Sequence, residues 1–295
     1  MRKELQADLL LLFVALSWGA SNYAISICLT ELSPLTINIF RFIAAVVTVG
    51  LLGIKELKKT NFTTIKYAAV MGIFLTGNYF FTNMGVANTT LSNAGFFCGL
   101  SCVFTPFGEW IFFEKKPEKK VWFVVALCAA GIFLMSMKGD FSINMSHIFG
   151  DLLCIGCALS YTGNILVTDK AVMDERSNAY NLGAWQIAFT FIFSTILATA
   201  FEHPSVPHSP VVIGCIIFLG VLCTGIAYVI QPIAQQYTTG THVGLIFSLE
   251  PVFCAIIAFF FAGEVLFVQN YIGMILLLAA IIILEIDFKP KKEKK

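Results

Sequence analysis

Ionisable side chains lie inside apolar stretches of this sequence, where a charge is costly and usually has a purpose. Glu250 lies in the apolar run that begins near Gly240, and Pro251 after it has no backbone N–H to donate. A carboxylate at this position can carry a proton or bind a substrate amine, or it can bond freed backbone groups and a neighbouring helix. Arg41 can hold a substrate carboxylate through its forked guanidinium, or make a structural pair, or reach toward the interface.

Aromatic and amide side chains recur at related places in the chain. Trp18 and Asn22 in the first apolar run have counterparts in Tyr161 and Asn164 of the sixth run, and such groups can line a substrate site or simply pack helices together. His242 is a candidate for gating or proton transfer, with an interhelical hydrogen bond as the alternative. The candidate substrate-binding residues are Trp18, Asn22, Arg41, Asn78, Tyr79, Asn83, Tyr161, Asn164, Gln186, Tyr228, Gln231, His242 and Glu250.

The sequence predicts no metal, cofactor or catalytic residue. Its nine cysteines fall in apolar stretches, where a thiol behaves as a small hydrophobe. A P-loop is absent from the sequence, which argues against an ATP-driven pump. The alternative function is a membrane-embedded enzyme acting on a lipid or isoprenoid substrate, but its usual motifs (H-E-x-x-H, an aspartate-rich run, G-x-S-x-G) are absent. Nothing in the charge pattern favours nucleic-acid binding.

The elements that must position these residues are transmembrane helices. The chain of 295 residues is 58% hydrophobic and 13% charged, with a mean hydropathy of +0.83, whereas a soluble domain is about 45–50% apolar and about 25% charged. We therefore predict an all-α integral membrane protein with ten spans, or eight or nine if the joints at 88–90 and 237–240 are not real breaks. The predicted spans are 7–29, 34–54, 66–87, 90–113, 120–138, 149–169, 179–201, 209–236, 240–262 and 267–287.

The placement of basic residues predicts the orientation. With the N-terminus in the cytoplasm, 17 of the 19 Lys and Arg residues fall on the inner side, the exceptions being Lys138 outside and Arg41 within a span. Both termini are therefore expected in the cytoplasm, and the protein is expected to be a multi-pass protein of the cell (cytoplasmic) membrane. The tail 289–295 is basic and predicts contact with lipid headgroups.

The sequence also indicates an internal repeat. Residues 8–18 match residues 151–161 at a shift of 143, and residues 79–95 match residues 228–244 at a shift of 149. We predict a first five-helix repeat at 1–139 and a second at 140–288. Because five is odd, the second repeat enters the membrane from the opposite side and is inverted, which is a common architecture of secondary transporters.

Several motifs resemble the EamA-type family of the drug/metabolite transporter superfamily over essentially the whole chain. They are Ser17-Trp18-Gly19, Phe40-Arg41-Phe42, Gly244, Ser248-Leu249-Glu250-Pro251-Val252 and Gly263-Glu264. The resemblance implies a ten-helix carrier for small organic metabolites, often amino acids or related compounds and often exported. The first half departs from the pattern, since its counterpart of the most specific stretch reads Leu100-Ser101-Cys102-Val103-Phe104.

Taken together, the sequence predicts a secondary transporter rather than an enzyme. It would alternate access around a central cavity lined by both halves, driven by a proton or substrate gradient. Its expected partners are a small-molecule substrate, membrane lipid and, if coupled, a proton. The sequence leaves a monomer and a homodimer equally open.

Overall fold

The computed structural model describes residues 2–86, 88–89, 97–136, 148–261, 263 and 266–286, and within these ranges the chain is helical without a β-strand. Several features of the sequence lie outside the described residues: Lys138, Glu264 of the last family motif, the boundary between the predicted halves at 139–140, and the basic tail at 289–295. The predicted joint at 88–90 and the repeat stretch 79–95 lie partly outside them.

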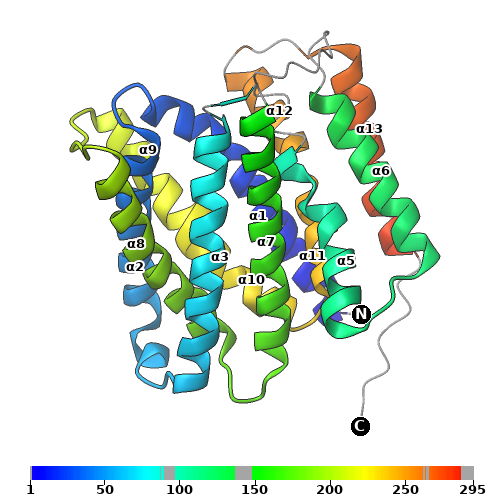
Figure 1. Ribbon diagram of the computed structural model, residues 1–295, viewed down its shortest axis with the longest axis horizontal. Helices are drawn as coiled ribbons and strands as arrows, with labels where there is room; N and C mark the ends of the chain where they lie inside the picture. The colour runs from blue at the N-terminus through cyan, green and yellow to red at the C-terminus, as the bar shows by residue number, and fades with distance from the viewer. Residues whose placement is uncertain are drawn as a thin grey trace.

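The helices form a single bundle whose members run up and down between two ends (Figure 1). α1 begins and α13 ends at the same end, drawn at the bottom of Figure 1, which we call the lower end. The elements are α1 (Arg2–Cys28), α2 (Pro34–Leu57), α3 (Phe62–Val86), α5 (Ser101–Phe113), α6 (Lys119–Ser136), α7 (Ile148–Met173), α8 (Ala179–Phe201), α9 (Pro210–Gly220), η2 (Val221–Ile226), α10 (Ala227–Gln235), α11 (Gly240–Phe247), α12 (Glu250–Phe261) and α13 (Val268–Ile286).

Within the part of the chain that the structure describes, six stretches are long and apolar enough to cross a membrane. They are α1 from Lys3, α2, α7, α8, the span α9–η2–α10 and the span α11–α12, and two shorter apolar helices occur at Phe97–Phe113 and Val268–Leu284. The outward surface fits lipid contact, because large apolar side chains such as Leu51 (76% exposed) and Phe112 (73% exposed) point away from the bundle. The predicted joint at 237–240 is confirmed as a break between α10 and α11.

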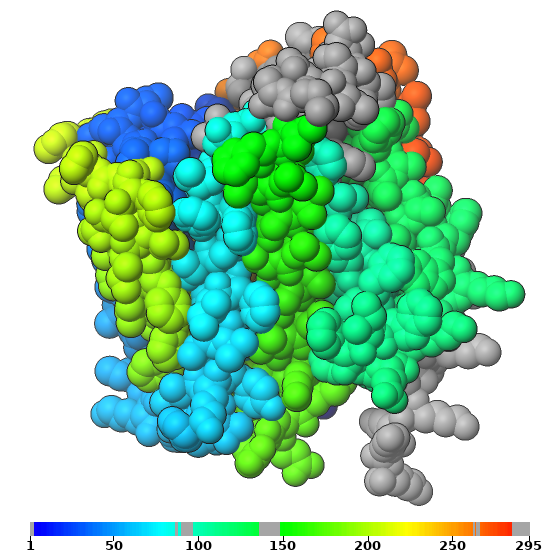
Figure 2. All heavy atoms as spheres, viewed as in Figure 1, coloured from blue at the N-terminus to red at the C-terminus, as the bar shows by residue number. Residues whose placement is uncertain are grey.

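Helices from the two predicted halves pack in close pairs. α3 lies along α7, and α6 lies along α13, as Figures 1 and 2 show. α8 packs against both α2 and α3, while α1 packs against α10 and α12. Each half therefore buries its helices mainly against the other half. The apolar helix faces that do not meet lipid are covered by these contacts.

The buried apolar side chains form two main cores. The larger core, which includes Leu11, Phe42 and Ile187, joins α1, α2, α8, α9 and α10. The smaller core, which includes Cys128 and Leu277, joins α5, α6 and α13. The span α11–α12 belongs to both cores: its residues 243, 246 and 247 face the larger one, and its residues 245, 249 and 252 face the smaller one.

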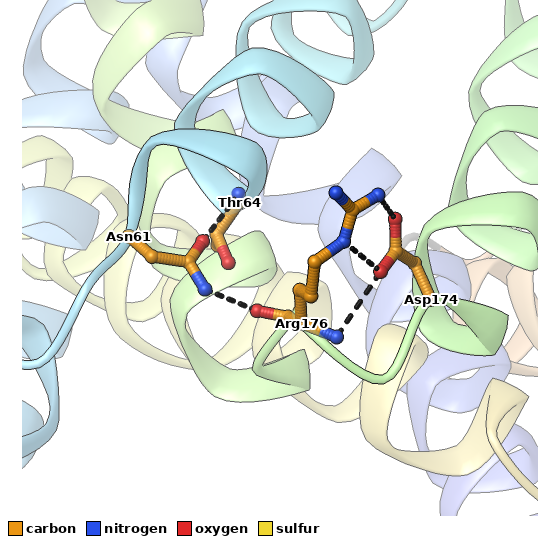
Figure 3. Close-up of polar contacts among 4 residues, drawn as sticks. All are labelled: Asn61, Thr64, Asp174 and Arg176. Carbon is orange, nitrogen blue, oxygen red and sulfur yellow. Dashed lines mark hydrogen bonds and ion pairs between the residues drawn. The ribbon is translucent and has the colours of Figure 1, made fainter.

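Two loops at the lower end are tied to each other (Figure 3). Asn61 caps α3 by accepting the Thr64 N–H at 2.8 Å, and its amide nitrogen donates to the backbone carbonyl of Arg176. The Arg176 guanidinium in turn donates two hydrogen bonds to Asp174, at 2.9 and 2.7 Å. This contact joins the α2–α3 loop to the α7–α8 loop and holds four helices together at this end.

Candidate functional site

The span α9–η2–α10 contains a π-helical turn, η2, in the middle of an otherwise α-helical segment. Gly220 before this turn lies directly against α2, where an added Cβ would come within 2.7 Å of the Arg41 carbonyl oxygen. Within the turn, the Thr224 hydroxyl donates to the Leu219 carbonyl at 2.8 Å. π-helical turns inside α-helices often mark functional sites, because they give backbone carbonyls new partners.

The Cys223 carbonyl of η2 accepts hydrogen bonds from two other helices. The Trp18 indole of α1 donates to it at 2.9 Å, and the Arg41 guanidinium of α2 donates to it at 3.4 Å. Arg41 also donates to the Thr224 hydroxyl at 2.5 Å, and the Cys223 thiol donates to the Ser17 carbonyl at 3.2 Å. The interruption therefore fastens α1 and α2 onto the second half, and it gives the buried Arg41 a structural set of partners.

Four aromatic rings pack together next to this interruption, and we call them the aromatic cluster: Trp18, Tyr161, Tyr228 and Phe247. The Trp18 ring centroid lies 4.7 Å from that of Phe247, 5.3 Å from that of Tyr228 and 5.7 Å from that of Tyr161. All four side chains are buried. The cluster brings one residue of α1 together with residues of α7, α10 and α11, so the predicted pair Trp18 and Tyr161 does meet.

Tyr79 adds α3 to the same region. Its hydroxyl oxygen lies 3.4 Å from that of Tyr228, and its ring lies under the Arg41 guanidinium at 5.1 Å from the carbon to the ring centroid. The ring also meets Phe42 edge-on at 5.2 Å between centroids. A cation over an aromatic face is attracted by the ring's negative face, so Tyr79 helps to orient Arg41.

Glu250 stands at a second interruption. Ser248 and Leu249 separate α11 from α12, and their N–H groups bond carbonyls three residues earlier instead of four. Glu250 then opens α12, where the positive end of the helix favours a carboxylate. We predicted Glu250 inside a continuous ninth helix, and the structure instead divides that span immediately before it.

The Glu250 side chain is half-buried, three residues after Phe247 of the aromatic cluster. The Asn22 side chain of α1 and the Arg41 guanidinium of α2 are both close enough to act on it electrostatically. Tyr161 likewise lies within the electrostatic reach of Glu250. A negative and a positive group therefore flank the same set of aromatic rings.

Asn164 and Gln186 are fully buried and bind backbone carbonyls of neighbouring helices. The Asn164 amide donates to the Met71 carbonyl at 3.0 Å and to the Gln186 side-chain oxygen at 3.1 Å. Gln186 in turn donates to the Tyr228 carbonyl at 3.1 Å. These two predicted residues hold α3, α7, α8 and α10 together and reach the aromatic cluster only through the backbone of Tyr228.

The remaining predicted residues are distributed along the bundle. Asn78 donates to a cysteine thiol of α7 at 3.2 Å, and Asn83 donates to the Pro34 carbonyl at 3.5 Å, near the upper end. His242 lies near the lower end, with its Nε2 atom 3.0 Å from the Asp8 carboxylate. Asn83 and His242 therefore lie toward opposite ends of the bundle, away from the aromatic cluster.

Three predicted residues carry buried polar atoms without a hydrogen-bond partner in the described structure: the Tyr161 hydroxyl, the side-chain oxygen of Asn164 and both amide atoms of Gln231. Gln231 is completely buried and follows Tyr228 by one turn of α10. A buried polar group without a partner costs free energy, and a ligand or a water molecule would relieve this cost. These atoms are therefore groups on which a bound molecule could be held.

Some members of the site were not predicted. They are the Cys223 carbonyl, the Thr224 hydroxyl and the Phe247 ring. A carbonyl has no signature in a sequence, and Phe247 is one of 29 phenylalanines. The only feature of the sequence that could have indicated this irregular turn is the pair of glycines at 220 and 225, which let η2 approach α2.

The arrangement can bind a small molecule between aromatic faces and two opposite charges. Within the described residues no cluster of three His, Cys, Asp or Glu side chains could hold a metal ion. Because the charged and aromatic groups come from several spans, movement of one span against another would change the shape of the site.

Comparison with known proteins identifies relatives of this chain. The model of the EamA-like transporter family matches twice, at residues 5–137 and again at 148–286. An uncharacterized transporter of Archaeoglobus fulgidus is 30% identical over 284 residues, covering 96% of this chain and 87% of that protein. A second uncharacterized transporter of the same organism is 26% identical over 265 residues, covering 88% of this chain and 90% of that protein.

Two further similarities are more distant. The uncharacterized transporter YwfM of Bacillus subtilis is 23% identical over 189 residues, covering 63% of this chain and 60% of that protein. A solved crystal structure shares the fold, with a TM-score of 0.83 at 15% sequence identity over 95% of this chain and 96% of that one. On the family match and the whole-chain relatives, the chain belongs to the EamA-like transporter family of membrane transporters.

Proposed function

We propose that this transporter is a secondary carrier that moves a small organic metabolite by alternating access. The observation that carries this proposal is the meeting of the aromatic cluster with Glu250 at the interruptions of two spans. Spans interrupted within the membrane, with polar groups at the break, are typical of substrate sites in secondary transporters.

The proposed architecture is ten transmembrane helices in two inverted repeats, 1–139 and 140–288. The family model supports it by matching two successive stretches of similar length. The helix packing supports it too, because contacts recur when each helix is exchanged with its counterpart: α3 packs on α7 as α10 packs on α1, and α3 packs on α8 as η2 packs on α2. Such symmetry would give two states of similar energy, open to opposite sides.

The proposed orientation places the lower end in the cytoplasm of the cell. Apart from Arg41, the Lys and Arg residues within the described helices and loops lie at or near that end, as the positive-inside rule requires of a cytoplasmic face. A green fluorescent protein fused after Ile286 should therefore fluoresce in cells, and a fusion truncated in the loop after Phe201 should not. The reverse pattern would overturn the orientation.

The proposed substrate carries an amine, as an amino acid or a related compound does, and export is the proposed direction. Glu250 is a half-buried carboxylate that can hold an ammonium group or exchange it for a proton. The Tyr161 ring, within electrostatic reach of Glu250, and the Trp18 ring packed against it can add cation–π attraction. Tyr161 and Gln231 offer polar atoms to the rest of the molecule.

Transport by purified protein in liposomes tests the proposal. Liposomes loaded with one unlabelled amino acid or amine would be offered the same labelled compound, with and without a pH gradient. We expect exchange of at least one compound by the wild-type protein. Glu250→Gln keeps the size and a hydrogen-bonding group but removes the charge, so we expect reduced exchange and an altered pH dependence.

Glu175→Gln is the matched control, because Glu175 is exposed in the loop after α7. It removes the same charge without touching the site, and we expect wild-type exchange. Folded wild-type protein that exchanges none of the amino acids, amines, nucleosides or vitamins tested would overturn the transport proposal. Unchanged rate and pH response in Glu250→Gln would overturn only the role of this carboxylate.

A further inference from the structure

Of the two helices in the span α11–α12, α11 lies nearer the lower end, and all eight of its residues are buried. A carboxylate of α5 holds the start of this helix: Glu109 accepts the Thr241 N–H at 3.1 Å and the Thr241 hydroxyl at 2.5 Å. Glu109 therefore satisfies one of the N–H groups that have no partner within the helix. This contact fixes one side of α11 to the first half.

A second contact fixes α11 to α1. The Nε2 atom of His242 lies 3.0 Å from an Asp8 carboxylate oxygen, and their side chains are only 3% and 18% exposed. A hydrogen bond of this kind between two groups shielded from water is stronger than the same contact at a surface. Asp8 and His242 thus join α1 and α11 near the lower end.

The charged groups on the elements packed around α11 are few. α1, α5 and α7 are these elements. They carry Arg2, Lys3, Glu4 and Asp8 on α1, Glu109 on α5, and Asp169 and Lys170 on α7, with Asp151 at the opposite end of α7. Asp169 pairs with Lys115 at 3.6 Å. Lys3 lies over the Tyr237 ring, 5.6 Å from its centroid, immediately before α11. Asp8 is therefore the acidic partner that His242 contacts directly.

We propose that the Asp8–His242 pair is a proton-binding site that latches α11 to α1 at the lower end of the transporter. Histidine exchanges its proton near neutral pH. With the proton bound, imidazolium and carboxylate form an ion pair, which is stronger than the hydrogen bond from a neutral imidazole N–H to the carboxylate that is left when the proton leaves. The latch therefore holds at the lower pH and loosens as the pH rises through the range in which histidine titrates.

The latch acts on the span that carries part of the candidate site. His242 and Glu250 are eight residues apart in the same span, or about 12 Å along a helix, with the break at Ser248 and Leu249 between them. Release of α11 from α1 would free the segment that ends at Phe247, a member of the aromatic cluster. This proton site is separate from Glu250 and goes beyond the proposed transport of a metabolite.

Hydrogen–deuterium exchange tests the latch without any knowledge of the substrate. The full-length protein in lipid nanodiscs would be compared at about pH 6 and about pH 8.5, on either side of the usual histidine range, with exchange corrected for the intrinsic pH effect. We expect the amides of residues 240–247 to exchange about tenfold faster at the higher pH, because the ion pair is then replaced by a weaker hydrogen bond. Amides of α8 should show no such difference.

Variants separate the proton site from a merely structural contact. His242→Gln keeps a side-chain donor but cannot titrate in this range, and Asp8→Asn removes the carboxylate while keeping its shape. In both variants we expect the exchange of residues 240–247 to become independent of pH. His203→Gln is the matched control, because His203 is exposed at the upper end, and it should keep the wild-type pH response.

Two outcomes would overturn the proposal. One is equal corrected exchange of residues 240–247 at both pH values in the wild-type protein. The other is a wild-type pH response that survives in His242→Gln, or in Asp8→Asn if the histidine variant does not fold. Because exchange is measured without substrate, a failure here leaves the transport assay of the proposed function unaffected.

Discussion

α8 and the span α9–η2–α10 pack against each other but use their backbones differently. α8 is one regular helix, with the Asn178 side chain accepting the Asn181 N–H at its start. Its side chains donate outward to carbonyls of other helices, as Tyr180 does to Val49 at 2.6 Å and Gln186 does to Tyr228 at 3.1 Å. The interrupted span does the opposite, because its Cys223 carbonyl accepts donors from α1 and α2.

This difference in backbone use distinguishes α8, which acts as a scaffold, from the span α9–η2–α10, which forms part of the candidate site. In a regular helix the carbonyls are already bonded, so α8 can bind its neighbours mainly through side chains. In the interrupted span the backbone itself is a binding surface, and the candidate residues Trp18 and Arg41 gather on it. The same holds for α11–α12, where Glu250 follows the break. Irregular backbone inside a membrane is tolerated where protein surrounds it or where it lines a cavity.

The largest expected effect comes from overpacking the contact between α8 and the interrupted span. In Gly183→Leu, the first added carbon would lie 2.4 Å from the Tyr228 carbonyl oxygen and 2.7 Å from the Val229 Cα atom. These are backbone atoms, which cannot move away as a flexible side chain can. We therefore expect the free energy of unfolding to fall by an amount at or above the upper end of the usual range of about 1–3 kcal/mol for overpacking. The measurement is the thermal unfolding midpoint of a fluorescent fusion in detergent.

The matched control for this change is Gly214→Leu. Nothing lies within 4 Å of a Cβ added at Gly214, which is in the same span. This variant should unfold at the wild-type temperature, because leucine is at least as good as glycine in a helix exposed to lipid. Equal stability of the two variants would show that the close approach of α8 to the interrupted span contributes little.

The next largest effect is expected from removing Arg41. Arg41→Ala removes the charged donor of Thr224 and Cys223 and the cation over Tyr79. A hydrogen bond from a charged group contributes about 1.5–3 kcal/mol, so we expect a clear drop in the unfolding midpoint. Arg41→Lys should restore only part of it, since a single ammonium cannot reproduce the fork.

This result would decide how Arg41 is used. If Arg41→Ala unfolds at the wild-type temperature but no longer exchanges substrate, the guanidinium binds cargo and its contact with η2 is incidental. If both stability and exchange fall, and Arg41→Lys recovers them partly and together, the residue holds the interruption in place.

Hydropathy and charge predict the scaffold well but not the interruptions. The predicted limits of the seventh span, 179–201, coincide with α8, and the second predicted span begins with α2 at Pro34. An apolar run of 26 residues, by contrast, gives no sign of a π-helical turn, because residues 221–226 are as apolar as their neighbours. Pro232 lies inside α10, after the irregular turn.

For the candidate site, too, the sequence selects some residues that the fold brings into one region and others that it uses elsewhere. Trp18, Tyr161 and Glu250 were chosen by residue type, and the fold brings them into one region. Asn164 and Gln186 were chosen by the same reasoning, yet their amides are bound to one another and to backbone. Residue type shows that a polar group must be satisfied, but only the fold shows whether a carbonyl or a substrate satisfies it.

A smaller effect is expected where the scaffold helices are capped. Asn61 caps α3 and also donates to the Arg176 carbonyl, whereas Asn178 caps α8 through the equivalent bond to Asn181. Replacing either asparagine by alanine should cost about 1 kcal/mol for the lost cap. We expect Asn61→Ala to unfold at a lower temperature than Asn178→Ala, since it also loses the contact between the loops drawn in Figure 3. Equal midpoints would mean that this contact adds nothing.

The smallest effect is expected at Asp174, on the loop at the lower end of the scaffold. Hydrogen bonds from the Arg176 side chain and backbone lower the pKa of the Asp174 carboxyl from 3.8 to about 2. A carboxyl with a lowered pKa in the folded state stabilises the protein above its unfolded pKa, and this contribution is lost only as the pH falls toward about 2. The pair should therefore contribute a constant amount between about pH 5 and about pH 8.

Asp174→Asn tests this constancy. Because surface ion pairs contribute little, we expect a slightly lower unfolding midpoint than wild type, with the same difference at about pH 5 and about pH 8. Glu175→Gln, at the adjacent exposed position, should not lower the midpoint at either pH. A difference that shrinks at the lower pH would mean that the carboxyl already titrates there and that Arg176 does not hold it. A constant difference would show that Arg176 keeps the Asp174 carboxyl ionised across this range.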